Sequence, residues 1–536
     1  MATRKLALIL SGAVSLGSFE AGVLTELLYA LDHLARLGDP KFELDVITGA
    51  SAGSMTAALV ARSVLHDFGL RRRLFEAWVN DIDIRNLLEG APDNALLSKD
   101  PIEKIADRCF TGPFAATAPA SFAPETLHMA FTLSNVNGLD AKLRYRLGDA
   151  FVATFFADGA EFHLGPREAV DPGVWQSIRQ CAIASGNFPI AFVPALVNRI
   201  QTDFAGYTFD PRFPGKFTYV DGGLFNNEPI GRAVELAWGA DGEELDRTRK
   251  FLLVDANLNK TRVAAEFDDK QSLLAIALRL VNMLNGEASA LDWLQAQRRN
   301  TEIEWRDLLL EQLLEMIATN DLADPDRLVA QLDAVANRIV DQKRALLGDD
   351  RYPPSYLATA LERTARRYHD QIGALSDVRR KILVRVIFVL NSIAGLDRKS
   401  VLDIDIIFAS KEQTAGDQLS AFGGFFKREW REYDYRLGRI AAHERLPKIL
   451  DVPQYPQEAG AEREYLIPVE WAGFANVKLA EADRAPREAF RDAVATRIRA
   501  IADGGGKPSW FHPVDRAKGN FIEKFVKSKL NELLDL

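Results

Sequence analysis

The chain has 536 residues, of which 47% are hydrophobic and 26% charged, and its net charge is −9. This composition is that of a globular protein with a large core, and it excludes a disordered chain, a collagen and a small disulfide scaffold. The acidic balance argues against a dedicated nucleic-acid binder. Two cysteines in so long a chain, Cys109 and Cys181, indicate a reducing compartment and two small core residues rather than a disulfide.

The N-terminus allows two interpretations. Arg4 and Lys5 precede an apolar stretch, as in a short signal peptide, but three glycines interrupt this stretch and no clear cleavage site follows it. We therefore favour a buried first strand over residues 5–10, and we expect the mature protein to keep its N-terminus. Elsewhere no uncharged apolar run reaches about 18 residues, so we predict no transmembrane helix.

Up to about residue 265, strand patterns alternate with helical patterns. Short runs rich in β-branched and other apolar residues predict strands at 5–10, 42–48, 127–133, 217–220 and 250–254. Amphipathic stretches between them predict helices at 19–36, 54–68 and 229–238. Strands that alternate with helices imply an α/β fold with a mostly parallel sheet, covered by helices on both faces.

The sequence changes character after about residue 269. Residues 271–347 are almost free of proline and glycine, and apolar side chains recur there at helical spacing, at Trp305, Leu309, Leu313 and Met316 and again at Leu328, Leu332, Val335 and Ile339. They predict a helical hairpin that turns within 320–326. Such a hairpin could be a lid or a membrane-facing arm, but packing in a helical bundle is the commoner use, and we expect it to pack on the α/β core.

The C-terminal part combines three features. Residues 401–408 alternate as a strand does, and residues 422–439 interleave aromatic and arginine side chains. Such a segment could bind nucleic acid or anionic head groups, but it more often packs, with guanidinium groups that pair with acids and stack on rings. Residues 520–536 predict an amphipathic helix with a solvated lysine face. We thus expect three regions: an α/β core at 1–265, a helical hairpin or bundle at 266–400, and a mixed extension at 401–536 that packs on the core.

One motif points to nucleophilic catalysis. The run Gly49-Ala-Ser51-Ala-Gly53 follows the strand predicted at 42–48 and precedes a helix. A tight strand-to-helix turn forces its middle residue into a strained backbone, and flanking glycines relieve the crowding. The hydroxyl of Ser51 would then project from the strand end, beneath the positive end of the helix. GxSxG alone also arises by chance, and a serine in an ordinary turn is the alternative.

A serine nucleophile needs a base and donors for an oxyanion. In Tyr219-Val-Asp221-Gly-Gly223 an apolar strand ends in an aspartate, and the two glycines permit the close approach of a backbone or a substrate. The run from Leu10 to Gly17 is another strand-end loop that opens a helix, and its amides could donate to an oxyanion. It lacks the spacing of dinucleotide and Walker loops, so we do not expect nucleotide binding.

Together and in this order, the three motifs resemble the patatin-like phospholipase family. That family carries a glycine-rich oxyanion loop near its N-terminus, then GxSxG, then Asp-Gly-Gly or Asp-Gly-Ala, which here are residues 11–17, 49–53 and 221–223. The stretch 184–194 is similar to a family segment, and residues 422–439 are similar to the C-terminal extension of a bacterial patatin-related subgroup. The resemblance covers about residues 5–257 and implies a three-layer α/β/α core with a large, mainly helical C-terminal region.

The resemblance also implies a Ser–Asp dyad. Ser51 attacks an ester carbonyl, Asp221 accepts its proton and returns it to the leaving group, and water then hydrolyses the acyl-enzyme. The implied oxyanion donors are the amides of Gly12, Ala13 and Val14, and the motif glycines are Gly17, Gly49, Gly53, Gly222 and Gly223. A carboxylate with its reference pKa of about 3.9 is a weak base, so burial must raise the pKa of Asp221 or ordering must compensate.

The first loop departs from the family pattern of three successive glycines followed by a basic residue. Ala13 and Val14 replace two of the glycines, and Leu16 stands where the arginine would be. Backbone amides can still donate, because they need no particular side chain. The departure leaves open the shape of the loop and any role of the missing charge.

Two other classes of function remain open. A histidine after Asp221 could complete a Ser–Asp–His triad, for which His369, His443 and His512 are available. The protein could also be a non-catalytic binding or regulatory protein on a degenerate patatin fold. By resemblance we expect a lipid acyl-ester hydrolase of the phospholipase A or lysophospholipase type.

We expect this hydrolase to need no metal or other cofactor, because no His, Asp or Glu cluster has the spacing of metal ligands. Its expected partner is a lipid or other acyl-ester substrate, and no nucleic acid. We expect it in the cytoplasm, where it could contact the inner face of the membrane peripherally.

Overall fold

A computed structural model describes residues 3–38, 41–110, 114–144, 150–204, 207–209, 212–241, 249–256, 324–347, 353–393, 404–409, 413–417 and 421–502, with isolated positions beyond these ranges. Most of the predicted helix at 520–536 lies outside the described residues, as do Trp305 and Met316 of the first stripe of the predicted hairpin. The other two residues of that stripe, Leu309 and Leu313, are described as isolated helical positions. The proposed region boundaries near 265 and 400 also lie outside the described residues.

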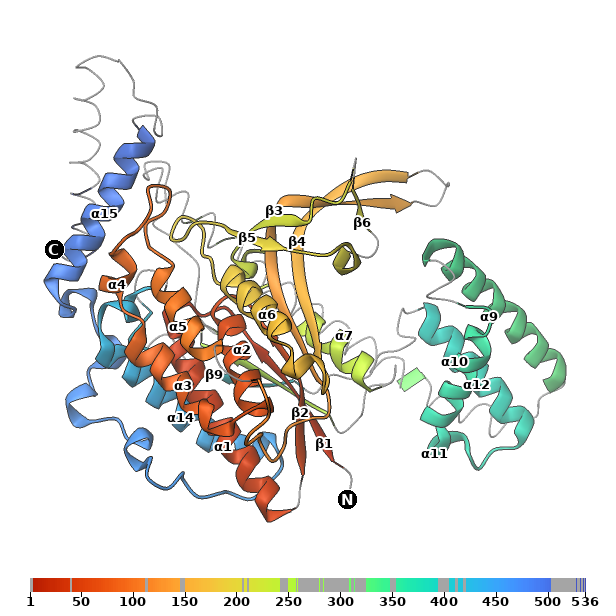
Figure 1. Cartoon of the computed structure of the whole chain (residues 1–536). Coiled ribbons are helices and arrows are strands. Elements are labelled where there is room, and N and C mark those ends of the chain that lie inside the picture. The colour runs from red at the N-terminus through yellow and green to blue at the C-terminus, as the bar shows by residue number, and fades with distance from the viewer. Residues whose placement is uncertain are drawn as a thin grey trace.

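A nine-stranded sheet forms the centre of the α/β part (Figure 1). Its order is β5-β7-β3-β2-β1-β8-β9, with β4 and β6 also paired to β3. The strands β3, β2, β1, β8 and β9 run parallel, whereas β4, β6 and β7 pair antiparallel with β3, and β5 with β7. The bounds are β1 Arg4–Leu10, β2 Phe42–Gly49, β3 Leu127–Arg144, β4 Ala150–Leu164, β5 Ala195–Asn198, β6 Tyr207–Thr208, β7 Lys216–Val220, β8 Lys250–Asp255 and β9 Ile404–Phe408.

Helices cover the two faces of this sheet, which confirms the predicted α/β fold with a mostly parallel sheet. Leu6, Leu8 and Leu10 of β1 point into the larger core, shared with α1, α2 and α6. Their neighbours Ala7 and Ile9 pack on the opposite face against α7. The helices of the α/β part are α1 Gly17–Leu37, α2 Ala52–Leu65, α3 Arg73–Phe75, α4 Ile84–Leu88, α5 Asp100–Phe110, α6 Pro172–Ser185 and α7 Ile230–Ala240.

The register of the sheet brings the candidate motifs together. Leu10, at the end of β1, lies opposite Gly49 of β2 and Val254 of β8. The loop after β1 and the GxSxG turn after β2 therefore start side by side at the same edge. Cys109 and Cys181 are both free and buried in this core, as predicted, and burial raises the pKa of the Cys109 thiol to about 11.

Four helices from the middle of the chain pack on one another and lie to one side of the sheet in Figure 1. Asp324 caps the first of them, since its carboxylate accepts the amide hydrogen of Arg327 at 3.1 Å. The bounds are α9 Pro325–Leu347, α10 Tyr356–Arg367, α11 His369–Ile372 and α12 Asp377–Ile393. The second predicted stripe therefore lies on α9, as a helix.

In the C-terminal part, a further helix, α14 Arg428–Ile449, packs against the outer side of α1. The helix α15 Arg484–Ala502 follows later in the chain. The backbones of α1 and α14 touch at glycines: a Cβ atom on Gly22 would lie 1.9 Å from the Tyr435 carbonyl oxygen, and one on Gly438 would lie 2.1 Å from the Phe19 carbonyl oxygen. The aromatic and arginine side chains of 422–439 are largely buried, with Trp430, Arg431 and Arg439 almost fully so. Arg439 faces α1, whereas Trp430 packs in a second apolar cluster with Phe188 and Phe422.

Within the described parts of the chain, one helical stretch, Val14–Leu37, is long and apolar enough to span a membrane by length and composition alone. In the structure 89% of its apolar window is buried, between the sheet and α14. The core helix of a globular domain meets the same criterion, so the stretch is weak evidence for a membrane span.

Candidate active site

Ser51 occupies a strained turn between β2 and α2, with φ of 50° and ψ of −122°. A non-glycine residue in such a conformation costs about 1–3 kcal/mol, and this strain is typical of the turn that presents a nucleophile. The flanking glycines are needed for space. A Cβ atom on Gly49 would lie 2.7 Å from the backbone of Gly53, and one on Gly53 would lie 2.6 Å from the Leu10 carbonyl oxygen.

The hydroxyl of Ser51 donates a hydrogen bond to the carboxylate of Asp221, and Oγ lies 2.6 Å from Oδ2. Both side chains are buried. Asp221 follows β7, and its second carboxylate oxygen accepts the amide hydrogen of Gly223 at 2.8 Å. The Asp221 amide donates to the Asn187 carbonyl at 2.9 Å, and the Ser134 hydroxyl donates to the Asp221 carbonyl at 2.7 Å. The carboxylate is thus held in one orientation.

Burial raises the pKa of Asp221 to about 6, although the hydrogen bonds from Ser51 and Gly223 act in the opposite direction. The glycine after the aspartate makes this burial feasible, because a Cβ atom on Gly222 would lie 2.0 Å from the Thr132 carbonyl oxygen. A carboxylate with this pKa remains ionised at neutral pH and is a stronger base than an exposed aspartate.

The loop after β1 runs directly past the serine. A Cβ atom on Gly12 would lie 3.2 Å from Cβ of Ser51 and 2.1 Å from Oδ1 of the buried Asn227, so a larger residue there would have to displace the Asn227 side chain. The amide of Gly12 donates to the Asn227 carbonyl at 3.1 Å. Among the described residues, no acceptor faces the amides of Ala13 and Val14, which begin the 3-10 helix Val14–Leu16. These two amides are therefore better placed than that of Gly12 to bind an oxyanion.

Val14 replaces a glycine of the family pattern, and its backbone adopts a conformation that is usual for glycine. Its φ of 50° lies in the left-handed region, which a β-branched residue rarely adopts. The side chain of Leu16, where the related loops carry arginine, is fully buried in the core. The loop thus keeps a glycine-like conformation without the glycine.

Ser185, the last residue of α6, also contributes to the site. Its hydroxyl accepts the amide hydrogen of Ser51 at 2.9 Å and lies 2.8 Å from the hydroxyl of Ser54. The sequence assigned no role to Ser185, although it lies in the stretch 184–194. In the sequence Ser185 is marked only as a small polar residue at the end of a helix. Its hydrogen-bond partners, Ser51 and Ser54, are more than 100 residues away.

The three candidate histidines differ in their surroundings. Nδ1 of His443 donates a hydrogen bond to the Glu26 carboxylate at 2.8 Å, and His369 lies on α11 among the helices beside the sheet. His512 lies outside the described residues. Within the part of the chain that the structure describes, no group of three or more His, Cys, Asp or Glu side chains could hold a metal ion.

A cavity opens beside the Ser51–Asp221 pair. Its lining side chains come from α2, α5 and α6, from the segment around Trp78, and from the C-terminal residues Phe422 and Phe425. Val14 of the first loop also reaches into it. The pair therefore faces an apolar cavity rather than open solvent.

A strained serine on a strand-to-helix turn, bonded to a buried acidic side chain, is an arrangement typical of serine hydrolases. Residues 8–234 match the family described as Patatin-like phospholipase, and the chain carries a patatin-like phospholipase domain, the domain of a lipid acyl hydrolase family. Residues 343–464 match a second family, described as Protein of unknown function (DUF3376).

Similar proteins include one relative and one solved structure. "Uncharacterized protein y4iI" from Sinorhizobium fredii (strain NBRC 101917 / NGR234) is 22% identical over a match that covers 42% of this chain and 45% of that protein. The chain therefore spans less than half the length of this relative. The crystal structure of VipD from Legionella pneumophila is 14% identical, with a TM-score of 0.24, over 89% of this chain and 93% of that one. A TM-score this low supports no assignment.

Proposed function

We propose that the protein is a serine lipid acyl hydrolase in which Ser51 and Asp221 act as a catalytic dyad. The observation that carries the proposal is the 2.6 Å hydrogen bond from the Ser51 hydroxyl to a buried carboxylate whose pKa is raised to about 6. The hydroxyl hydrogen of Ser51 points at the Asp221 carboxylate, a base of suitable strength, and this geometry supports the proposed proton transfer.

The proposed reaction proceeds through an acyl-enzyme. Ser51 Oγ attacks the ester carbonyl carbon while its proton passes to Asp221. The negative charge that develops on the carbonyl oxygen is stabilised by the amides of Ala13 and Val14. Asp221 then gives the proton to the leaving alkoxide. In the second half, Asp221 takes a proton from water, the hydroxide attacks the acyl-enzyme, and Ser51 regains its proton as the carboxylic acid leaves.

The geometry favours a dyad over a triad. In a triad the histidine lies between the serine and the acid, whereas Ser51 is bonded to Asp221 itself. His443 is bonded to Glu26, which belongs to a separate polar cluster between α1 and α14. The direct contact leaves no place for an imidazole between the two catalytic groups.

A fluorophosphonate probe and ester hydrolysis test this proposal together. The wild-type protein should be labelled at Ser51, and Ser51→Ala should lose both labelling and hydrolysis. Asp221→Asn should reduce the rate about 100-fold or more, because an amide cannot take the proton. His369→Gln is the control and should stay within a few-fold of wild type. Retained hydrolysis in Ser51→Ala would remove the nucleophile from the proposal, and absent labelling of wild type would indicate a non-catalytic protein.

A lipid substrate also implies contact with a lipid surface, which we propose to be peripheral. Ile190 and Phe225 are 40% and 42% exposed and lie close in the chain to the cavity residues Phe188 and Asp221. Replacing either with aspartate should weaken co-sedimentation with phospholipid vesicles. Leu37→Asp is the matched control, because Leu37 is 67% exposed at the far end of α1. Equal binding of all variants would contradict the proposed contact.

A further inference from the structure

The cavity beside Ser51 is apolar almost throughout. Apart from Ser51, Asp221 and Arg179 its lining side chains are apolar, and Arg179 is already paired with Glu103 and Asp107 on α5. The cavity has a volume of about 100 Å³, which is small beside the usual volume of small-molecule sites. Such a lining favours a hydrocarbon chain, since a polar group would lose its hydrogen bonds to water there.

Part of the cavity wall comes from outside the patatin domain. Phe422 and Phe425 belong to the stretch that matches the family of unknown function, and both line the cavity that contains Ser51. The ring of Phe422 stands edge-on to Phe188 at 5.4 Å and to Phe425 at 5.9 Å. Phe188 follows α6, the helix that ends at Ser185. The wall is thus an aromatic contact between the two matched parts of the chain.

Hydrogen bonds fix this wall to the catalytic loop. The Gly424 amide donates to the Ser15 hydroxyl at 3.2 Å, and a Cβ atom on Gly424 would lie 2.6 Å from that oxygen. The buried guanidinium of Arg431 donates to the carbonyls of Gly424 and Phe425 at 2.9 and 3.2 Å. The segment that carries both rings is therefore held against the loop beside Ser51.

We propose that Phe422 and Phe425 limit the length of the acyl chain that the cavity accepts, so that the C-terminal part of the chain is a specificity element of the active site. The inference rests on the proposed function, because it takes the acyl group of the ester at Ser51 as the occupant. Buried rings that are paired and anchored cannot move aside for a longer chain as exposed side chains would.

The test uses the full-length protein and p-nitrophenyl esters that differ only in the acyl group, from acetyl through octanoyl to palmitoyl. Phe422→Ala and Phe425→Ala should raise the ratio of palmitate to acetate kcat/KM by about tenfold or more, because they open space at the wall. Phe422→Trp should shift the preference towards shorter chains. An acetyl group is too short to reach the wall formed by Phe422 and Phe425, so hydrolysis of the acetate ester reports on the catalytic pair alone.

Phe426→Ala is the matched control. Phe426 lies in the same segment and is equally buried, but its ring packs against Phe490 and does not line the cavity. It should lose stability like the other variants and keep the wild-type chain-length profile. If wild type hydrolyses these esters and the ratio is unchanged in Phe422→Ala and Phe425→Ala, or shifts to shorter chains, the inference is wrong. If wild type is neither labelled nor active on acetate, the proposed function itself fails.

Discussion

The protonation state of Asp221 controls the proposed chemistry. Its carboxylate must be ionised to accept the Ser51 proton, and burial raises its pKa to about 6. We therefore expect kcat/KM for a neutral ester to be constant above about pH 7 and to fall tenfold per pH unit well below pH 6. A rate profile in buffers of constant ionic strength checks this. If kcat/KM instead falls to half its plateau value near pH 4, the Asp221 carboxylate is not desolvated in the free enzyme.

The same burial should cost stability. A carboxyl group whose folded pKa lies above its unfolded value of 3.8 favours folding only while protonated, and this advantage is lost as the pH rises through about 6. Asp221→Asn should therefore be more stable than wild type at pH 8, by up to about 3 kcal/mol. Urea unfolding at pH 8 and at pH 4 measures the difference, which should fall to well under about 1 kcal/mol at pH 4, close to the unfolded pKa. An equal difference at both pH values would contradict ionisation as its cause.

Ser51 and Asp221 could be predicted from the sequence, but the residues that hydrogen-bond to the site around them could not. Ser51 and Asp221 stand in motifs whose glycines are required by local crowding, and such crowding leaves a signature in the sequence. Ser185 and Asn227 contact the site from distant segments through a hydroxyl and a carbonyl. Many residues could supply these groups, so no local pattern marks the two positions.

At the scale of elements, the strands β1, β2, β7 and β8 and the helices α1, α2 and α7 were predicted to within a few residues, because their apolar periodicity reflects burial. The strands β4, β5 and β6 and the helices from α3 to α6 were not predicted. The long hairpin of β3 and β4 was not predicted beyond residue 133. Residues 134–144 are rich in Asn, Asp, Gly and Lys, which are poor strand formers. Pairing with β4 holds them extended, with an irregular register between Ser134 and Leu139.

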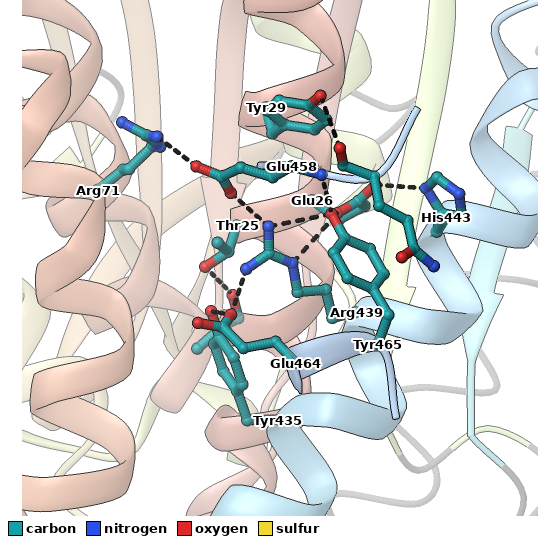
Figure 2. A network of polar contacts seen from close by, with 12 residues as sticks. Thr25, Glu26, Tyr29, Arg71, Tyr435, Arg439, His443, Glu458, Glu464 and Tyr465 are labelled. Carbon is teal, nitrogen blue, oxygen red and sulfur yellow. Dashed lines mark hydrogen bonds and ion pairs between the residues drawn. The ribbon is translucent and has the colours of Figure 1, made fainter. Parts of the chain in front are cut away.

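The contact between α1 and α14 contains a buried polar network, shown in Figure 2. The guanidinium of Arg439 lies among three carboxylates, those of Glu26, Glu458 and Glu464. Tyr465 donates to Glu26 at 2.6 Å, and Arg71 pairs with Glu458. The network links the helix that follows the catalytic loop to the C-terminal part of the chain.

Removing the central cation should be costly. Arg439→Leu would leave the buried carboxylate of Glu26 facing those of the partly buried Glu458 and Glu464, and we expect a loss of about 3 kcal/mol or more in the free energy of unfolding. Arg484→Leu is the control, because that arginine is 74% exposed and pairs with Glu488 on one helix, which contributes less than about 1 kcal/mol. Chemical unfolding of both variants measures the contrast. Equal small losses would show that the network contributes little to the contact.

At the scale of the whole molecule, the C-terminal part completes the α/β part. It covers α1 with α14, adds β9 beside β8 at the edge of the sheet, and supplies Phe422 and Phe425 to the cavity. The sequence indicated that 422–439 packs, but it could not show against what, since the partner surface on α1 lies some 400 residues away. The predicted division at about 265 and 400 lies outside the described residues and stays a prediction.

Residues 1–265 expressed alone should therefore be insoluble or inactive. Without α14 the face of α1 around Gly22 is exposed, β8 becomes an unprotected sheet edge, and the cavity loses its aromatic wall. Soluble yield and fluorophosphonate labelling of Ser51 measure the effect, with the full chain expressed in parallel. Co-expression of residues 401–536 should recover part of the soluble, labelled fragment, because the contact surfaces would again be covered. If residues 1–265 fold alone with full esterase activity, the C-terminal part is an independent module and neither the covering of α1 nor the aromatic wall is needed for catalysis.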